Sequence, residues 1–89
     1  MVANLMYYFI VNPNAGSGRG LKAWKAIARY LERRNIEYEV FLTHGTGEAR
    51  MKARELTEGV REPRSIFVVG GGGTVNEAVG GISFHGPGS

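Results

Sequence analysis

Residues 67–79 read FVVGGGGTVNEAV, and they place four consecutive glycines between an apolar run and a segment with helix-forming residues. Glycine loses more backbone entropy on folding than any other residue, at a cost of about 0.5–1 kcal/mol relative to alanine in regular structure. Four in a row therefore indicate that bare backbone is needed. Unshielded N–H groups beside a helix N-terminus are typical of a loop that holds a phosphate. We expect this role for residues 70–73.

Thr74 and Glu77 follow the glycines with the T-x-x-E spacing of a capping box. In that motif the Thr74 hydroxyl would accept a hydrogen bond from the amide of Glu77, and the Glu77 carboxylate would accept one from the amide of Thr74. The spacing predicts that a helix starts at Thr74. The competing interpretation of the glycines is a tight turn with positive φ, but such a turn needs one or two glycines rather than four.

The rest of the chain alternates strand and helix patterns around this stretch. Continuous apolar or strand-forming runs predict strands over 5–11, 37–43 and 65–69. Helical periodicity and helix-forming residues predict helices over 21–35, 48–58 and 74–82, with Trp24 as a core anchor and Gly59 closing the second helix. The order βαβαβα predicts an α/β fold with an open parallel sheet in three layers. We expect one domain over residues 1–82 and a fraying tail over 83–89.

Parallel strands bring all their strand-to-helix loops to one edge of the sheet, which is where open α/β folds bind ligands. The loops concerned are residues 12–20, 43–47 and 70–73. The first, NPNAGSGRG, contains Gly18-x-Gly20-x-x-Ala23, which matches the dinucleotide spacing only weakly. Gly18 lies far beyond the strand, and Thr43 stands where a ribose-binding acid is expected. No Walker A sequence is present.

Composition narrows the function classes. The chain has 89 residues, 14 of them glycine, and the absence of cysteine excludes disulfides and thiolate metal sites. No apolar run approaches the roughly 20 residues of a membrane-spanning helix, and the N-terminus lacks signal-peptide features, so we expect a soluble, cytoplasmic protein. The net charge of +3 permits an anionic partner. His44 and His85 have no partners at metal-ligand spacing and are interpreted as loop residues.

Three motifs together resemble the N-terminal, nucleotide-binding half of the diacylglycerol kinase catalytic domain family, which includes bacterial lipid kinases and is similar to sphingosine and ceramide kinases. They are NPNAGSG over 12–18, Thr43 with GEA over 47–49, and VGGGGTVNE over 69–77. The resemblance spans nearly the whole chain. It implies an ATP-dependent transferase of lipid metabolism and phospholipid biosynthesis, in which a lipid hydroxyl attacks the γ-phosphate. The residues that it implies for ATP binding are Asn12, Pro13, Asn14, Ala15, Gly16, Thr43, Gly70, Gly71, Gly72, Gly73, Thr74, Val75 and Asn76.

This sequence departs from the family pattern in two ways. The family signature is Gly-Gly-Asp-Gly-Thr, and Gly72 stands where its aspartate belongs. The resemblance implies Mg²⁺ as a cofactor, but Gly72 offers no ligand for it, and we expect neither a metal-binding residue nor a catalytic residue in this chain. The family also has a second, β-rich domain that supplies the base and the lipid cleft. We therefore expect the chain to be part of a longer kinase and to bind nucleotide without full activity.

Other functions stay open at this point. The chain could be a non-catalytic nucleotide-binding or assembly module, or a protein similar to NAD kinase. The glycine at position 72, in place of the family's aspartate, favours the non-catalytic module. Expected partners are ATP or ADP and, in the longer protein, a lipid substrate, with no nucleic acid. Peripheral contact with a membrane through the basic side chains of the first helix, and a homo-oligomer, are left open. A purely structural scaffold would bind no nucleotide.

Overall fold

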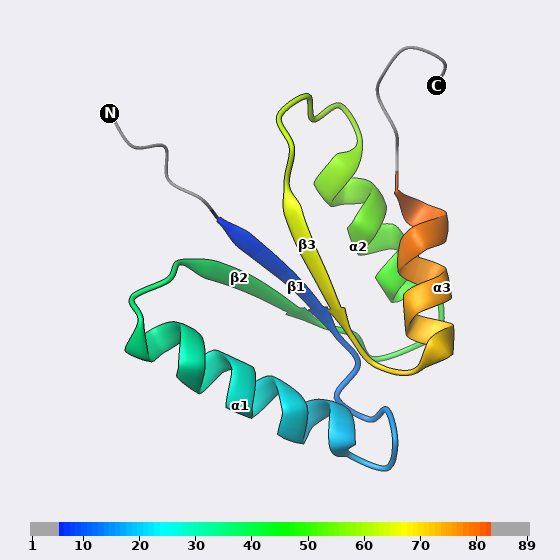
Figure 1. Ribbon diagram of the computed structural model, residues 1–89. Coiled ribbons are helices and arrows are strands. Elements are labelled where there is room, and N and C mark those ends of the chain that lie inside the picture. Colours follow the sequence, from blue (N-terminus) through cyan, green and yellow to red (C-terminus); the bar gives the residue numbers. More distant parts are fainter. Residues whose placement is uncertain (1–5, 83–89) are drawn as a thin grey trace.

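The computed structural model describes residues 6–82, and the predicted tail over 83–89 lies outside them. The chain order is β1 (Tyr7–Val11), α1 (Arg19–Arg33), β2 (Tyr38–Leu42), α2 (Glu48–Thr57), β3 (Ser65–Val69) and α3 (Gly72–Gly81), as Figure 1 shows. The predicted βαβαβα order is confirmed. No helix within this part of the chain is long and apolar enough to cross a membrane.

The three strands form one parallel sheet in the order β2-β1-β3, with Val11 paired to both Leu42 and Val69. The central position of β1 explains its continuous apolar sequence, because both of its faces are covered. The ladder continues just past the strands. The amide of Thr43 donates to the Val11 carbonyl at 2.8 Å, and the amide of Asn12 donates to the Val69 carbonyl at 2.8 Å. The loops after all three strands therefore leave from one edge.

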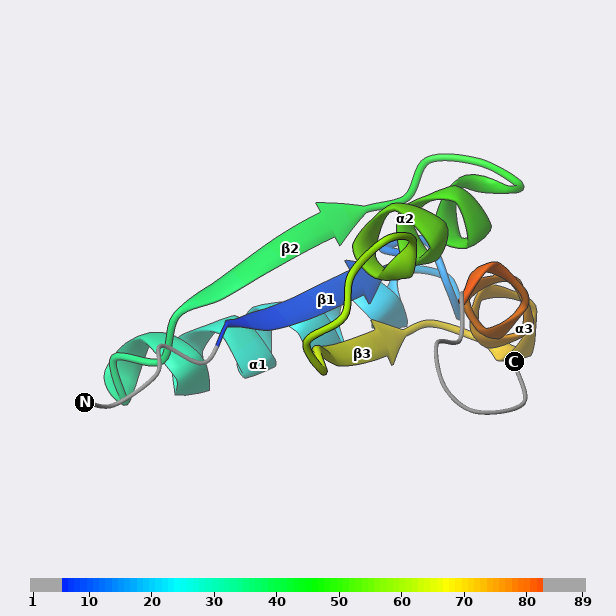
Figure 2. The same cartoon turned by 90° about the horizontal axis from the view of Figure 1, so that it is seen from above.

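Helices cover both faces of the sheet, which gives the predicted three layers (Figures 1 and 2). On one face, Trp24 and Leu31 of α1 pack with Phe9 and Val11, and the Phe9 and Trp24 ring centroids are 5.1 Å apart. Trp24 is thus confirmed as a core residue. Leu21 of the same helix is 37% exposed.

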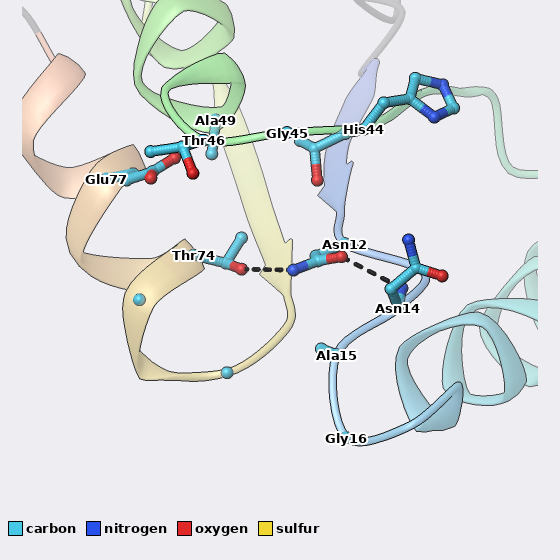
Figure 3. Close-up of a pocket in the computed structure, with 13 residues that line it drawn as sticks. Asn12, Asn14, Ala15, Gly16, His44, Gly45, Thr46, Ala49, Thr74 and Glu77 are labelled. Atoms are coloured by element: carbon cyan, nitrogen blue, oxygen red, sulfur yellow. Dashed lines mark hydrogen bonds between the residues drawn. The ribbon is translucent and has the colours of Figure 1, made fainter.

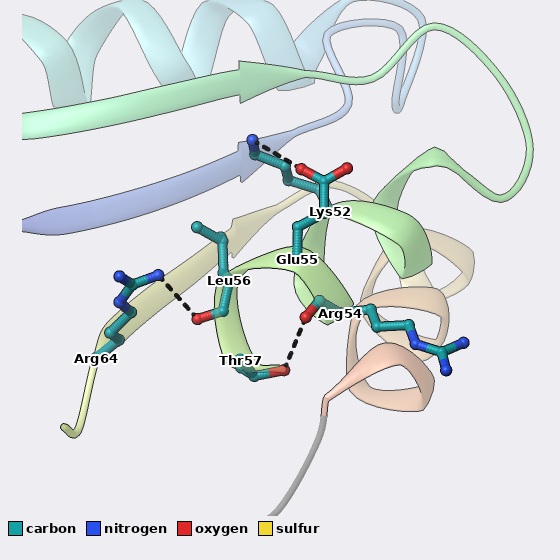
Figure 4. A network of polar contacts seen from close by, with 6 residues as sticks. All are labelled: Lys52, Arg54, Glu55, Leu56, Thr57 and Arg64. Atoms are coloured by element: carbon teal, nitrogen blue, oxygen red, sulfur yellow. Dashed lines mark hydrogen bonds and ion pairs between the residues drawn. The ribbon is translucent and has the colours of Figure 1, made fainter. Parts of the chain in front are cut away.

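On the other face, α2 and α3 pack over Ile10 through a core made mainly of alanine. Small side chains let the two helices approach closely: a Cβ added to Gly81 would lie 2.1 Å from the Arg50 carbonyl oxygen. The C-terminal end of α2 is connected to the residue that precedes β3, because Arg64 Nη1 donates to the Leu56 carbonyl at 3.0 Å (Figure 4). The alanine core and the close approach of Gly81 to Arg50 hold α3 against α2 and so set where the α3 N-terminus points.

Both ends of α1 and of α3, and the C-terminal end of α2, differ from the predicted bounds. α1 begins at Arg19 rather than residue 21, and α3 begins at Gly72 rather than at Thr74. The α2 helix ends at Thr57, with Glu58 as the cap residue and Gly59 next at a φ of 73°. The earlier starts of α1 and α3 matter for function, because both bring glycine-rich backbone into the first turn of a helix at the ligand-binding edge.

Candidate functional site

A pocket of about 440 Å³ lies at the carboxyl edge of the sheet, between the three strand-to-helix loops (Figure 3). All three loops and the helices that follow β2 and β3 contribute to its wall. Its volume falls within the range of about 300–1,000 Å³ that is usual for small-molecule sites. The lining residues are Asn12, Asn14, Ala15, Gly16, Thr43, His44, Gly45, Thr46, Ala49, Gly71, Gly73, Thr74 and Glu77.

Asn12 links two of these loops across the pocket. Its Nδ2 donates to the Thr74 Oγ1 at 3.2 Å, and its Oδ1 accepts a hydrogen bond from the Asn14 amide at 3.1 Å (Figure 3). The first bond joins residues 62 positions apart in the sequence. Because both ends of the Asn12 amide are used within the protein, this side chain serves to hold the loop after β1 against the first turn of α3.

The loop after β1 is held in a demanding backbone conformation. Gly16, Ser17 and Gly18 have φ values of 60°, 59° and 99°, in the left-handed region that favours glycine. Gly20 then passes so close to the end of β1 that an added Cβ would lie 2.0 Å from the Asn12 carbonyl oxygen. The amides of Gly20 and Leu21 donate to the carbonyls of Ala15 and Pro13 at 3.0 Å each. These contacts place Ala15 and Gly16 at the pocket wall.

The capping box predicted for Thr74 and Glu77 is wrong. Gly71 is the N-cap residue, no side-chain hydrogen bond caps α3, and the first intrahelical bond runs from the Val75 amide to the Gly71 carbonyl at 3.1 Å. Thr74 therefore lies inside the first turn, where it accepts the Asn12 bond. The Glu77 Oε1 instead accepts a hydrogen bond from the Gly47 amide at 3.1 Å. Both side chains connect α3 to other loops rather than to its own N-terminus.

The glycine run also differs from the expected loop. Gly72 and Gly73 are helical, and within the described chain residues 70–73 have no positive φ, so the tight-turn interpretation does not apply. A Cβ at Gly70 would meet Thr74 at 2.8 Å, whereas Gly71, Gly72 and Gly73 have open space. The amides of Gly72, Gly73 and Thr74 precede the first intrahelical hydrogen bond. Such amides at a helix N-terminus attract anions.

The loop after β2 supplies the third wall. Thr43 is buried, and its hydroxyl donates to the Val11 carbonyl at 3.4 Å. The His44 amide donates to Glu48 Oε1 at 2.8 Å, and the His44 ring points away from the pocket in Figure 3. Gly47, with a φ of 90°, is the N-cap of α2. This loop is therefore fixed at its start by β1 and at its end by Glu77 of α3.

Most of the residues predicted from the sequence meet in this pocket, and some do not. Pro13, Gly70, Gly72, Val75 and Asn76 are outside its lining. Gly70 lines a second hollow of about 290 Å³ with Arg19, and this hollow shares Ala15, Gly16 and Gly71 with the first. Sequence reasoning missed five lining residues. The predicted loop over 43–47 contains three of them, His44, Gly45 and Thr46, and the motifs over 47–49 and 69–77 contain the other two, Ala49 and Glu77.

The acidic side chains around the pocket do not form a Mg²⁺ site. Magnesium prefers oxygen ligands, usually one or two carboxylates together with phosphates and water. Among the described residues, Glu77 is the acid in the lining, and it is engaged by the Gly47 amide. The first turn of α3 contains no acid, and residues 6–82 contain no group of three His, Cys, Asp or Glu side chains able to hold a metal. The donor set does not fit the ion.

Comparison with known proteins identifies the family. Residues 6–88 match the diacylglycerol kinase catalytic domain family, so the chain belongs to that family. It is 39% identical over 78 residues to the Bacillus subtilis (strain 168) protein named "Putative lipid kinase YtlR", which covers 85% of this chain and 25% of that protein. It is 32% identical over 73 residues to the ceramide kinase of Oryza sativa subsp. japonica, which covers 81% of this chain and 12% of that protein. The chain thus spans about a quarter of one relative and about an eighth of the other.

Proposed function

We propose that this member of the diacylglycerol kinase catalytic domain family is the ATP-binding part of a lipid kinase, and that the pocket between the three loops holds the nucleotide. The observation that carries the proposal is the α3 N-terminus. Its unpaired amides and its bare glycines Gly71 and Gly73 border a pocket whose other walls are the loops after β1 and β2. An anion at such a position gains about 0.3–1 kcal/mol from the helix dipole, and up to about 2 kcal/mol when partly buried.

In this proposal the phosphates lie against Gly71, Gly73 and Thr74, where the helix amides are available. Asn12 and Asn14 belong to the pocket wall formed by the loop after β1. Thr43 lies at the floor of the pocket, beside the end of β1. The sequence-based assignments of Pro13, Gly70, Val75 and Asn76 to the nucleotide site remain predictions. Gly70 supports the site indirectly, since it gives Thr74 room to meet Asn12.

Because the donor set does not fit Mg²⁺, we propose that nucleotide affinity of this chain depends only weakly on that ion. An acid at position 72 would repel free ATP unless a cation lay between them. Gly72 carries no such charge, and the open space around it means that no neighbour has replaced the missing side chain. ATP or ADP alone would therefore be a ligand for the pocket.

Transfer to a lipid requires more than these residues. The chain spans about a quarter of the length of its bacterial relative. We propose that the lipid acceptor site and the catalytic base belong to the remainder of a longer kinase, and that residues 1–82 act as its nucleotide-binding domain. We propose that this kinase is cytoplasmic and that its lipid acceptor brings it to a membrane surface. Oligomerisation of the longer protein remains a prediction.

The second candidate function is a nucleotide-binding module without transfer activity. The specific observation in its favour is the absence, within residues 6–82, of an acidic side chain in the first turn of α3. Phosphoryl transfer depends on positioned charge that neutralises the transferring group. An activity assay of the longer protein would distinguish the two functions. A kinase converts ATP and a diacylglycerol or ceramide substrate to ADP and phospholipid, whereas a binding module binds ATP without turnover.

Calorimetric titration tests nucleotide binding in the chain itself. ATP and ADP are titrated into the purified protein with and without Mg²⁺. AMP, which carries a single phosphate, is titrated for comparison. We expect saturable binding of ATP and ADP, at least tenfold weaker binding of AMP, and weaker ATP binding by the Thr43→Val variant. Glu62→Gln, on the exposed loop before β3, is the matched control and should bind as the parent does. Equal affinities for AMP and ATP would contradict the proposal that the pocket binds the phosphates of the nucleotide.

A further inference from the structure

The β2 strand lies at one edge of the sheet. β1 lies on one side of it, and no other element of residues 6–82 lies on the other side (Figure 2). An edge strand presents a row of N–H and C=O groups that can pair with another chain, and proteins often protect such an edge with proline, lysine or a bulge. β2 pairs with β1 in unbroken register over Tyr38–Leu42 and contains neither proline nor lysine. Its outer edge is therefore open to a further strand.

The hydrogen bonds to β1 establish which backbone groups of β2 point outward. The Tyr7 amide donates to the Glu37 carbonyl at 3.3 Å, and the Thr43 amide donates to the Val11 carbonyl at 2.8 Å. In a strand the N–H and C=O of one residue point to the same side, and that side alternates along the chain. The odd-numbered residues over 37–43 thus face β1. The groups that face away from the sheet belong to Tyr38, Val40 and Leu42.

The side chains of these three residues share the face of the sheet that α1 covers. Tyr38 and Leu42 pack against the core cluster around Phe9 and Trp24. Val40 lies between them, yet it is 40% exposed. A β-branched apolar side chain thus lies uncovered at the centre of the free edge.

The opposite face of β2 carries an acid and a cation close to the same edge. Glu39 is exposed and, within residues 6–82, has no hydrogen bond or ion pair. Phe41 follows on the same face, and Lys52 Nζ of α2 lies 5.0 Å from the centroid of its ring. Lys52 also forms an ion pair with Glu55 at 3.4 Å (Figure 4). A carboxylate without a partner and an ammonium group therefore flank the edge of β2.

We propose that two copies of this chain associate through β2, in an antiparallel pair centred on Val40. In this register Val40 lies opposite Val40 of the second copy, and Tyr38 lies opposite Leu42. All of these are hydrogen-bonded pairs, because each member has its N–H and C=O directed outward. The register therefore uses every outward N–H and C=O group of β2 in both copies. It also covers the exposed Val40 side chain with its own equivalent.

The same register brings opposite charges together. Glu39 lies opposite Phe41 of the second copy in a non-hydrogen-bonded pair, the type in which facing side chains approach most closely. Lys52 lies over that Phe41 ring, so the Glu39 carboxylate meets the Lys52 ammonium of the other copy. Two-fold symmetry makes this contact twice. Opposite charges at cross-strand positions stabilise a sheet, whereas like charges destabilise it. The edge of β2 is thus complementary to a second copy of itself.

The other edge of the sheet, at β3, suits a different neighbour. A strand followed by a helix commonly returns through a right-handed crossover to a parallel strand beside the first. In a longer kinase the segment after α3 would cover β3 in this way and leave β2 at the edge. Because the paired β2 strands run in opposite directions, the pockets of the two copies lie at opposite ends of the combined sheet. Association through β2 therefore leaves both pockets open.

Sedimentation equilibrium of the 89-residue chain tests the association. Between about 5 and 500 μM protein, we expect the average mass to rise from that of a monomer toward twice that value. Val40→Lys places two ammonium groups at the centre of the pair and should raise the dissociation constant about 100-fold. Val79→Lys is the matched control, because Val79 is 56% exposed on α3, and it should associate as the parent does. Amide NMR spectra of both variants establish that they are folded.

Charge exchange tests the register. Glu39→Lys places like charges together and should weaken association about tenfold, whereas Glu62→Lys, with the same change of charge on the exposed loop before β3, should not. The double variant Glu39→Lys with Lys52→Glu keeps the net charge of the parent. Its association should return to within about threefold of the parent value. Equal losses in Glu39→Lys and in the double variant would overturn the proposed register.

The remaining outcomes separate this inference from the proposed function. A parent chain that stays monomeric over the whole concentration range would contradict the inference, and so would a dimer that Val40→Lys leaves unchanged. Nucleotide titration of Val40→Lys should match the parent, because Val40 lies outside the pocket. A dimer that Val40→Lys disrupts, formed by a chain that binds no ATP, would support the β2 interface and contradict the nucleotide site.

Discussion

The two glycine-rich segments at the carboxyl edge of the sheet use glycine for different reasons. In the loop after β1, Gly16 and Gly18 have left-handed backbone, and Gly20 passes too close to Asn12 for any side chain. In the run after β3, Gly71, Gly72 and Gly73 have neither positive φ nor a neighbour within 4 Å of an added Cβ. The first segment needs glycine to fold, whereas most of the second does not.

This difference indicates which of the two segments binds a ligand. Glycine without a steric role still lowers helix stability, and residues 72 and 73 occupy the first turn of α3. A ligand that approaches the amides of that turn would give these glycines a role. We therefore interpret the first glycine loop as a structural support and the second as a binding surface, and the following variants test this distinction.

Gly20→Ala should have the largest effect. Its Cβ would lie 2.0 Å from the Asn12 carbonyl oxygen, and both groups belong to backbone that cannot move without disturbing β1. We expect the free energy of unfolding to fall by about 3 kcal/mol, the upper range for overpacking. Urea denaturation measures the change through its midpoint at unchanged slope. A midpoint equal to that of the parent chain would mean that the two glycine segments do not differ as described.

Asn12→Ala should have the second largest effect. The variant loses the bond to Thr74 and the bond to the Asn14 amide, and it leaves the buried Thr74 hydroxyl without this partner. We expect a loss of about 1–2 kcal/mol in the free energy of unfolding, because a net hydrogen bond contributes about 1 kcal/mol and buried groups left unpaired add to this. Asn14→Ala is the control, since its side chain is exposed. Equal losses in the two variants would contradict the proposed link between the loops.

Gly72→Asp should stabilise the free chain slightly. The side chain has open space, and a carboxylate in the first turn of a helix gains about 0.3–1 kcal/mol from the dipole. The same charge should weaken ATP binding in the absence of Mg²⁺ and make binding depend on the ion. Thermal unfolding checks the first effect and calorimetry with and without Mg²⁺ checks the second. A Mg²⁺ dependence equal to that of the parent would count against the proposed effect of Gly72.

The smallest effect concerns Tyr38, which is distant from both segments. Its hydrogen bond to the Glu32 carboxylate, together with burial and the charge of Glu32, raises the pKa of Tyr38 above its usual value of 10.0. The stabilisation is complete below the pKa of the unfolded chain and is lost as pH rises through the higher pKa of the folded chain. Denaturation between pH 9 and 12 should show a slightly larger loss in the parent than in Tyr38→Phe. Identical profiles would exclude this contribution.

The sequence predicted the fold because its signals are local and strong. The apolar runs of β1 and β3 and the periodicity around Trp24 predicted the layers, and parallel topology then predicted that the three loops meet. The same reasoning failed at Thr74 and Glu77, whose T-x-x-E spacing matched a capping box. Their actual partners, Asn12 and Gly47, lie on other loops, so tertiary contacts decided what the local pattern could not. Glu77 was missed at the pocket for that reason.

The most direct test of the central claim is an amide NMR titration of the 89-residue chain with ATP, with and without Mg²⁺. Glycine amides report on each loop separately. The account predicts saturable shifts at Gly16, Gly71 and Gly73, with similar affinity in both conditions and little change at Gly59, which lies beyond the end of α2. A dispersed, folded spectrum without shifts at these glycines at millimolar ATP would contradict the assignment of the pocket to a nucleotide.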